Sequence, residues 1–464
     1  MIPVSLQQIA SDVSGRLLAG GSEQETAGSV IIDSRQAVPG TLFAAIPGER
    51  VDGHDYAQNA LELGASGVLV EDPERALATG ADPARLISVP STQDALGELA
   101  KANLLRVRMA GNPLVVGVTG SVGKTTTKDL LATLLEPRGP IIAPPGSFNN
   151  EIGLPLTVLR ADEKTATLVL EMGADHVGNL KHLTGIAPLD IGVVLAVARA
   201  HLGEFGGIEK VAEAKAELVT GIRDGGTAVL NADDFRVEAM KSKAKKVVMF
   251  SRTGEADVFA TDIEVGRDGR AAFTLNHDSE QARVNLGLVG EHHVSNALAA
   301  ATVGVLAGFD LAEIAQRLGG LGAASPHRMD VWSAGELTVI DDSYNANPDS
   351  MRAGLRALSQ IGQGGRRVAV LGAMLELGDE SDAEHASVGR ELSDLGIDTL
   401  IAVGAPALAE SASEAGIDTT EAADIDEAWA ALSPLLGEPG TILLKGSNGS
   451  KIWQLADRVK EETC

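Results

Sequence analysis

Apolar and polar positions alternate along the chain in a pattern that predicts short buried strands separated by helices. Short continuous apolar runs such as "LVVGV" and "TLVL" are typical of strands buried on both faces. Most are followed by segments in which apolar residues recur every three or four positions, as on one face of a helix. Strands and helices that alternate in this way favour parallel sheets with crossover connections. We therefore expect an α/β fold.

The first part of the chain, residues 1–100, predicts a small α/β domain. Its strand-like segments are "SVIID" at 29–33, "TLFAAI" at 41–46 and "GVLVE" at 67–71. A helical stretch runs from about Tyr56 to Leu63, and a longer one runs from about Gln93 to Ala110. The longer helix is expected to stop at the sequence Gly-Asn-Pro that follows it.

Two further α/β units follow. In residues 101–323 the strand candidates are "LVVGVTG", "ATLVLEMG", "IGVVLAVA" and "TAVLNADD". The loop-like segment "ASPHRMD" then introduces residues 324–464, whose strand candidates are "ELTVIDDS", "RRVAVLGAM", "DTLIAVG" and "TILLKGS". Each of these last strands is followed by a helical run, which is typical of a Rossmann-like domain. We predict three domains, with a central parallel sheet and a C-terminal Rossmann-like sheet.

The segment "VTGSVGKTTTK" joins a central strand to a helix through a glycine-rich turn. Such a turn directs backbone N–H groups and the positive end of the helix dipole at one point, which suits a phosphate chain. The standard P-loop spacing requires glycine at 118, where this chain has Val118, so the segment fits the shorter pattern T-G-x-x-G-K-T. The predicted ATP-binding residues are Gly120, Ser121, Val122, Gly123, Lys124, Thr125 and Thr126.

In this P-loop, Lys124 is expected to reach the terminal phosphates and the Thr125 hydroxyl to bind Mg²⁺. The motif indicates ATP or GTP, but motors, switches, kinases and ligases all use it. Glu171 and His201 follow two strands at the same predicted sheet edge, where ligands of parallel sheets collect. A carboxylate there suits Mg²⁺ opposite Thr125, and the alternative is a pair of solvated loop residues.

Lys215 falls on the apolar stripe of the predicted helix "IEKVAEAKAELVTGI", so it is expected to face inward. A buried ammonium is costly and its pKa tends to fall. Such a lysine needs a partner, a metal-linked role or a chemical modification. The alternative is a lysine at the helix edge that extends its ammonium into water.

The segment "GEHHVSNALAA" starts a helix with polar side chains that could face a purine, or could simply be ordinary helix-start residues. Adjacent side chains diverge on a helix and no further ligand is suitably spaced, so zinc at His292 and His293 is disfavoured.

Charge and composition restrict the partners. Lys and Arg total 38 against 64 Asp and Glu, for a net charge of -26, which repels nucleic acid and anionic membranes. The single cysteine, Cys464, excludes an intramolecular disulfide and a cysteine metal cage. The N-terminus lacks a signal-peptide pattern, and no apolar run approaches the roughly 18 residues of a membrane span. We expect a cytoplasmic monomer with no membrane span and no nucleic-acid partner.

Many of these segments occur in the order found in the Mur ligases of bacterial cell-wall synthesis, a family that the chain resembles along essentially its whole length. The segments are "DSRQAVPGTLFAAIPGERVDGHDY", "TGSVGKTTTK", "NNEIGLP", "EMGADH", "AHLGEFG", "AKAEL", "LNADD", "GEHHVSNALAA", "PHRMD", "DDSYNANPDSM", "LGAMLELGDE" and "LLKGSNGSKIW". Three of them, "NNEIGLP", "DDSYNANPDSM" and "LGAMLELG", are most similar to the members that add D-alanyl-D-alanine.

The resemblance implies an ATP-dependent amide ligase of peptidoglycan precursor synthesis. Such an enzyme joins D-alanyl-D-alanine to UDP-N-acetylmuramoyl-tripeptide through an acyl phosphate and releases ADP and phosphate. Lys124, Glu171, His201 and Lys215 would then be catalytic, with Thr125, Glu171 and His201 as Mg²⁺ ligands. Carbamylation of Lys215 by CO₂ would supply a carboxylate for a second Mg²⁺. The resemblance also implies that the C-terminal domain closes on the nucleotide.

The resemblance assigns further residues to substrates. Those at the nucleotide are Asn231, His292, Asn296, Arg328 and Asp342. Those at the UDP-sugar are Asp33, Ser34, Arg35 and Phe43. Those on the acceptor side are Asn345, Asn347, Glu376, Lys445 and Ser447. His293 and Asn448 depart from the family pattern, which usually has asparagine at the first position and frequently has arginine at the second.

Two other functions compete with this interpretation. The first is a sister ligase with a different amino-acid acceptor, such as the enzyme that adds the third residue or folylpolyglutamate synthase. The second is a regulatory or motor ATPase, which would leave the C-terminal α/β unit and Lys215 unexplained. Lysine and diaminopimelate fit equally well as the third residue of the peptide substrate.

Overall fold

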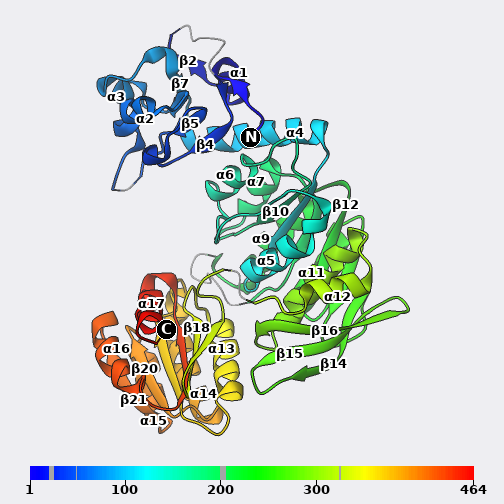
Figure 1. Cartoon of the computed structure of the whole chain (residues 1–464), viewed down its shortest axis with the longest axis vertical. Coiled ribbons are helices and arrows are strands. Elements are labelled where there is room, and N and C mark those ends of the chain that lie inside the picture. The colour runs from blue at the N-terminus through cyan, green and yellow to red at the C-terminus, as the bar shows by residue number, and fades with distance from the viewer. Residues whose placement is uncertain (20–25, 49, 199–204, 323–324, 464) are drawn as a thin grey trace.

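Three successive parts of the chain each build their own β-sheet, and the three follow one another along the molecule (Figure 1). The computed structural model describes residues 1–19, 26–48, 50–198, 205–322 and 325–463. None of the described helices is both long enough and apolar enough to cross a membrane. The predicted α/β fold with three domains is confirmed.

The N-terminal sheet has the strand order β2-β7-β6-β5-β4, and all its neighbours are parallel except β2 and β7. Its strands are β2 (Arg16–Leu17), β4 (Ser29–Ile31), β5 (Thr41–Ala44), β6 (Gly67–Val70) and β7 (Leu86–Ser88). The short strands β1 (Val4–Ser5) and β3 (Thr26–Ala27) pair separately. The helices are α1 (Leu6–Asp12), α2 (Ala57–Leu63) and α3 (Pro73–Ala78). Helix α4 (Thr92–Ala110) then runs across the predicted boundary at residue 100 into the central domain.

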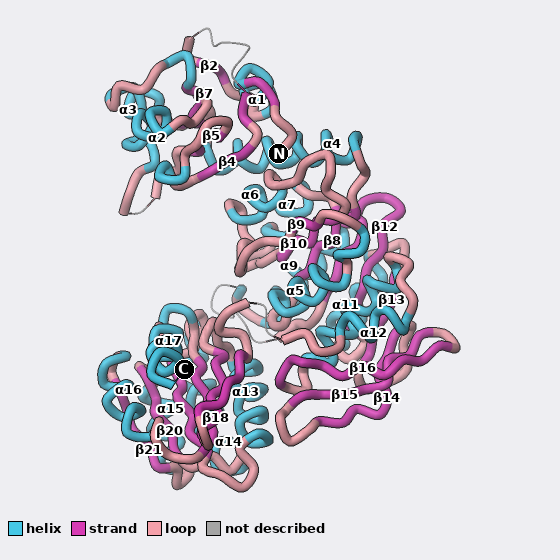
Figure 2. Tube along the Cα trace, in the orientation of Figure 1, coloured by secondary structure: helices cyan, strands magenta, loops and turns pink. Residues whose placement is uncertain are grey.

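The central sheet has nine strands in the order β16-β15-β14-β13-β12-β11-β8-β10-β9. The strands that pair in parallel are β8 (Leu114–Thr119), β9 (Ile141–Ile142), β10 (Thr167–Glu171), β11 (Leu189–Val194), β12 (Ile222–Asn231), β13 (Val247–Ser251) and β14 (Val258–Val265). Strands β15 (Arg270–His277) and β16 (Glu280–Val289) extend this sheet in antiparallel fashion (Figure 2). The predicted parallel sheet therefore has an antiparallel extension at this edge that was not predicted, where short turns join consecutive strands directly.

Helices cover both faces of the central sheet, and a separate apolar core lies beneath each layer. The helices are α5 (Lys124–Leu134), α6 (Gly153–Val158), α7 (Asn179–Ile186), α9 (Ile208–Thr220), α10 (Phe235–Ala239), α11 (His293–Leu306) and α12 (Leu311–Leu318). Helix α11 packs on α5, so the segment that follows β16 is brought beside the P-loop.

The C-terminal sheet has the order β17-β18-β22-β19-β20-β21, and only β17 is antiparallel. Its strands are β17 (Asp330–Ala334), β18 (Leu337–Asp342), β19 (Arg367–Gly372), β20 (Thr399–Val403), β21 (Asp418–Ala422) and β22 (Gly440–Lys445). Its helices are α13 (Pro348–Ile361), α14 (Ser381–Asp394), α15 (Pro406–Glu414), α16 (Ile425–Leu432) and α17 (Ile452–Thr463). Helices on both faces give the doubly wound arrangement expected of a Rossmann-like domain.

The carboxyl ends of strands from both larger sheets lie at one cleft. Strand β10 ends at Glu171, which is paired in register with Val118 of β8, just before the P-loop. In the C-terminal sheet, β18 ends at Asp342, opposite Lys445 at the end of β22. Ligands of open α/β sheets bind at such strand ends, so the fold places two ligand-binding edges against each other.

Candidate active site

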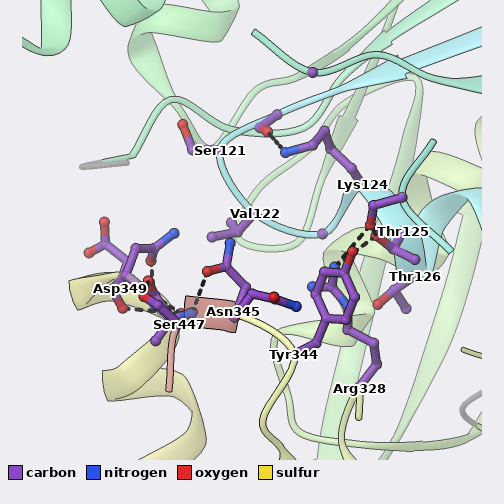
Figure 3. A pocket seen from close by; sticks show the side chains of 18 of the residues that line it. Ser121, Val122, Lys124, Thr125, Thr126, Arg328, Tyr344, Asn345, Asp349 and Ser447 are labelled. Atoms are coloured by element: carbon purple, nitrogen blue, oxygen red, sulfur yellow. Dashed lines mark hydrogen bonds between the residues drawn. The ribbon is translucent and has the colours of Figure 1, made fainter. Parts of the chain in front are cut away.

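A cleft of about 640 Å³ lies between the central and C-terminal domains. Its central wall includes the P-loop from Gly120 to Thr126, together with Glu171 and Lys215. Its C-terminal wall includes Arg328 and Tyr344 (Figure 3) and also Asp342. Most of the predicted nucleotide and acceptor residues line this single cleft.

The P-loop turn depends on a glycine at position 123. Gly123 precedes α5 with φ of 82°, a left-handed conformation that side chains disfavour. A Cβ atom built there would lie 2.3 Å from Oδ1 of Asn296 on α11. Asn296 therefore packs against the turn backbone, and no residue with a side chain fits at position 123.

Lys124 begins α5 and folds back over its own loop, where Nζ donates to the Gly120 carbonyl oxygen at 2.8 Å. Burial lowers the pKa of Lys124, the charge of Glu171 opposes that shift and Arg328 adds to it. A triphosphate would give this ammonium an anionic partner in place of a neutral carbonyl.

Thr125 contacts a residue of the other domain. Arg328 donates from Nη2 to Thr125 Oγ1 at 3.0 Å and lies 3.4 Å from Ser147 Oγ. Its guanidinium stacks over the Tyr344 ring, 4.0 Å from the ring centre (Figure 3). Arg328 thus links the C-terminal domain to the P-loop hydroxyl that is predicted to bind Mg²⁺.

Glu171 lies buried beside the P-loop, with a side chain that is 1% exposed. Its Oε1 accepts from Asn149 Nδ2 at 2.8 Å, whereas the buried Oε2 has no hydrogen-bond partner among the described residues. An unsatisfied carboxylate oxygen is expensive to bury unless a ligand completes it. Glu171 and the Thr125 hydroxyl therefore fit a hard divalent cation such as Mg²⁺.

Lys215 faces inward on α9, so the prediction of its burial is confirmed. Burial first, and then the charge of Lys124, lower its pKa to about 7. No described carboxylate counters these effects. A substantial fraction of this lysine is thus a neutral amine near pH 7, which makes it nucleophilic.

The half-buried His292 and the buried His293 line the cleft at the start of α11, with ring centres 4.0 Å apart. Burial lowers the pKa of His292 to about 4 and that of His293 well below its ordinary value. Asn296 Nδ2 lies 3.1 Å from His293 Nδ1, so the amide orientation assigns the ring proton to Nε2. That buried Nε2 has no partner among the described residues. Histidine at position 293, where the family usually has asparagine, thus places an uncharged N–H donor in the wall of the cleft.

The acceptor-side residues form a connected network. Lys445 is buried and donates from Nζ to Asp342 Oδ2 at 2.5 Å and to the Asn345 carbonyl oxygen at 3.0 Å. Ser447 Oγ accepts from the Leu375 N–H at 2.9 Å and holds the loop that carries Glu376. These residues line the cleft, and their contact with the acceptor stays a prediction.

Asn347 caps the start of α13, where its Oδ1 accepts from the Ser350 N–H at 2.9 Å. Its side chain therefore already has a structural partner, although the residue lines the cleft.

Asn231 does not line this cleft. Its Nδ2 donates to the Leu195 carbonyl oxygen at 2.8 Å, and its Oδ1 accepts from the Asp233 N–H at 3.0 Å. The amide thus ties the end of β12 to the residue that follows β11, and its contact with the nucleotide stays a prediction. His201 lies outside the described residues.

The predicted UDP-sugar residues lie in the N-terminal domain and do not line this cleft. Asp33 caps a short turn that starts at Ser34, and hydrogen bonding to the exposed Arg35 side chain lowers the pKa of Asp33. Phe43 is 1% exposed and packs in the domain core. Burial on β5 leaves the Phe43 ring almost no accessible surface in this structure, and its contact with a UDP-sugar stays a prediction.

Several cleft residues were not predicted as site residues, including Asn149, Tyr344, Arg352 and Arg356. Asn149 lies inside the segment "NNEIGLP", and the match of that segment to the family pattern could have indicated it. Arg352 and Arg356 have helical spacing on α13, but only the docking of the two domains shows which helix face meets the cleft.

Models of three domain families match the chain. The Mur ligase family catalytic domain matches residues 27–103, the Mur ligase middle domain residues 118–304 and the Mur ligase glutamate ligase domain residues 327–448.

Curated relatives match the chain along its length. A UDP-N-acetylmuramoyl-tripeptide–D-alanyl-D-alanine ligase of Mycobacterium bovis is 42% identical over 100% of this chain and 99% of its own length. The enzyme of that name from Escherichia coli is 35% identical over 100% of both chains.

Solved structures agree with these matches. MurF from Acinetobacter baumannii has a TM-score of 0.88 at 31% identity over 99% of both chains. MurF ligase from Thermotoga maritima in complex with ADP has a TM-score of 0.80 at 29% identity, over 94% of this chain and 97% of that chain. The domain matches and the full-length similarity together establish that this chain belongs to the Mur ligase family.

Proposed function

We propose that the protein is an ATP-dependent ligase that joins D-alanyl-D-alanine to UDP-N-acetylmuramoyl-tripeptide and releases ADP and phosphate. The reaction would belong to peptidoglycan precursor synthesis in the cytoplasm. The observation that carries the proposal is the direct contact of the P-loop Thr125 with Arg328 of the acceptor domain, within one cleft. The names of the full-length relatives support the identity of the two substrates.

Each domain would then bind one substrate. We assign the UDP-sugar to residues 1–100, with Asp33, Ser34 and Arg35 at the nucleotide sugar. ATP is assigned to residues 101–323 and the dipeptide to residues 324–464. A division of this kind suits a reaction that must align three substrates, because orientation rather than covalent help lowers its barrier. A monomer would suffice, since the cleft is built from one chain.

In the first step, a terminal carboxylate oxygen of the tripeptide attacks the γ-phosphorus of ATP. The bond to the β–γ bridging oxygen breaks, and ADP leaves as the acyl phosphate forms. Lys124 and the backbone N–H groups of the P-loop would hold the phosphate oxygens and stabilise their charge. Arg328 is placed to add positive charge from the opposite wall.

In the second step, the amine of the dipeptide attacks the acyl carbon. A tetrahedral intermediate forms, inorganic phosphate leaves with the C–O electron pair, and the amine loses a proton. The neutral imidazole of His292 lies in the cleft wall, and its low pKa keeps it free of a competing charge. Exclusion of water by the closed cleft would protect the acyl phosphate from hydrolysis.

Bound Mg²⁺ would neutralise the phosphate charges that oppose attack by an anionic carboxylate. Thr125 and Glu171 would hold one ion, with His201 as a further ligand outside the described residues. The unsatisfied Oε2 of Glu171 supports this assignment.

Lys215 would serve a second Mg²⁺ after carbamylation. Its neutral Nζ attacks the carbon of CO₂, an N–C bond forms and a proton leaves to solvent. The product is a carbamate anion. The pKa of about 7 supports this step, because only the neutral amine is nucleophilic.

The test is phosphate release by the purified protein with ATP, Mg²⁺ and a UDP-N-acetylmuramoyl-tripeptide, using both lysine and diaminopimelate peptides. D-alanyl-D-alanine should support turnover and give a product heavier by the dipeptide minus water. Turnover with a single amino acid instead would favour a sister ligase. ATP hydrolysis that ignores the UDP-peptide would favour a regulatory or motor ATPase.

A further inference from the structure

One face of α13 forms part of the C-terminal wall of the cleft. Asp349, Arg352, Ala353 and Arg356 all line it, at the spacing of a single helical face. The opposite face, which includes Leu358, is buried in the domain core. The helix is therefore fixed in rotation, and this fixed rotation directs two arginines toward the cleft.

The cationic groups of this wall differ in their partners. Lys445 is paired with Asp342, and Arg352 donates from Nε to Glu391 at 2.8 Å. Arg328 donates to the hydroxyls of Thr125 and Ser147 and stacks on Tyr344. Within the described residues, Arg356 is exposed and makes no hydrogen bond or ion pair. It is thus the cation of this wall that remains available for a ligand.

A dipeptide acceptor brings a fixed negative charge to this wall. Its amine must react, but its C-terminal carboxylate survives unchanged in the product and has to be held in an acidic protein of net charge -26. The planar guanidinium of arginine can donate two parallel hydrogen bonds to a carboxylate. We propose that Arg356 binds the C-terminal carboxylate of the dipeptide acceptor and so selects a dipeptide over a single amino acid. This inference rests on the proposed function.

The rise along α13 and the length of a dipeptide agree with the assignment of the carboxylate to Arg356. Arg356 lies seven positions after Asp349 in the first turn of α13, which is about 10 Å along the helix at about 1.5 Å per residue. An extended dipeptide spans about 7 Å from amine to carboxylate. A carboxylate at Arg356 would therefore place the amine near the start of α13, beside Asn345 and Lys445, whereas a single amino acid would be too short to reach both places.

The experiment measures the KM for D-alanyl-D-alanine and for D-alanyl-D-alanine amide, which lacks the carboxylate charge. The wild-type protein and Arg356→Gln, Arg356→Lys and Arg390→Gln variants are compared. Arg390 is the matched control, since it is an exposed arginine of α14 that does not line the cleft. Circular dichroism verifies that each variant is folded, and KM values for ATP and the UDP-peptide are measured alongside.

For Arg356→Gln we expect a KM for the dipeptide that rises about 10-fold to 100-fold, the usual size of a lost charge-assisted hydrogen bond. The KM for ATP and the UDP-peptide should change less than about twofold. Wild-type protein should prefer the free acid to the amide, Arg356→Gln should lose that preference, and Arg356→Lys should retain part of it.

A variant that keeps both the wild-type KM and the preference for the free acid overturns the inference, and so does a change confined to the UDP-peptide. These results leave the proposed function standing, because the dipeptide is still used. Absence of turnover with D-alanyl-D-alanine in the wild-type protein overturns the proposed function itself, and the role of Arg356 falls with it.

Discussion

Arg328 Nη2 lies 3.0 Å from Thr125 Oγ1, and 203 residues of chain separate the two side chains. The contact joins the C-terminal domain to the P-loop at the hydroxyl assigned to Mg²⁺. Nucleotide binding must therefore rearrange this bond, and the interface between the two domains should respond to ATP.

We predict that small-angle scattering changes when an ATP analogue and the UDP-peptide are added together. ATP in the P-loop would bridge the central and C-terminal domains through groups such as Arg328, so the bound state should be more compact. Identical scattering curves with and without ligands would argue against closure of the C-terminal domain.

Replacement of Arg328 by Ala should lower kcat/KM by about 100-fold to 1000-fold, because it removes a positive charge aimed at the phosphates. Steady-state kinetics and ATP titrations measure the effect. Arg267→Ala is the control, since this arginine is exposed on the central domain. Activity of the Arg328→Ala variant close to that of the control would contradict the assigned role.

Glu171→Gln should weaken the use of Mg²⁺ without lowering the stability of the fold. The substitution removes a buried carboxylate oxygen that has no partner in the described structure, so the unfolding free energy should stay equal or rise by about 1 kcal/mol. The Mg²⁺ concentration needed for activity should increase at least about 10-fold. Urea denaturation and Mg²⁺ titration test both effects, with exposed Glu255→Gln as the control. A large loss of stability would indicate a structural role instead.

Lys215→Ala should nearly abolish activity, and added short carboxylates such as acetate should partly restore it by replacing the carbamate. With ¹³C-labelled bicarbonate, the wild-type protein should show a carbamate carbon signal by NMR that the variant lacks. The signal should grow as pH rises through about 7, where the Lys215 amine loses its proton. Full activity in the alanine variant would remove the carbamate proposal.

The His327 side chain predicts a pH-dependent contribution to stability. A hydrogen bond to Asp341 at 2.8 Å raises the pKa of His327, and the charges of Asp341 and Asp457 act in the same direction against burial. The protonated His327 stabilises the fold fully below pH 6.5, the pKa of histidine in the unfolded chain. This stabilisation is lost as pH rises through the higher pKa of His327 in the folded protein. His327→Gln should therefore destabilise the protein by about 1 kcal/mol at pH 6 and by less at pH 9. Equal losses at both pH values in urea denaturation would exclude this linkage.

Much of the fold could be predicted because its signals are local. The apolar run before Gly120 and the helical spacing after Lys124 specified the strand, turn and helix of the P-loop. The antiparallel edge formed by β14, β15 and β16 was not recognised. Strand pairing depends on which segments meet, and alternation along one segment does not identify its neighbour.

The site residues likewise divide into those whose position follows from a local pattern and those whose position depends on distant neighbours. The inward position of Lys215 follows from the periodicity of its own helix and is confirmed by its burial. The core position of Phe43 and the structural use of the Asn231 amide did not follow from their motifs, because both depend on neighbours from other strands.

By itself, the sequence determined the α/β class, the phosphate loop and the inward lysine, since short-range periodicity and turn chemistry encode all three. Only the tertiary structure decided that Asp342 pairs with Lys445, that Arg328 reaches Thr125 and that Arg356 lines the cleft without a described partner. These relationships join residues far apart in the chain or depend on how two domains meet. Their energies arise from burial and charge in three dimensions, which no local pattern contains.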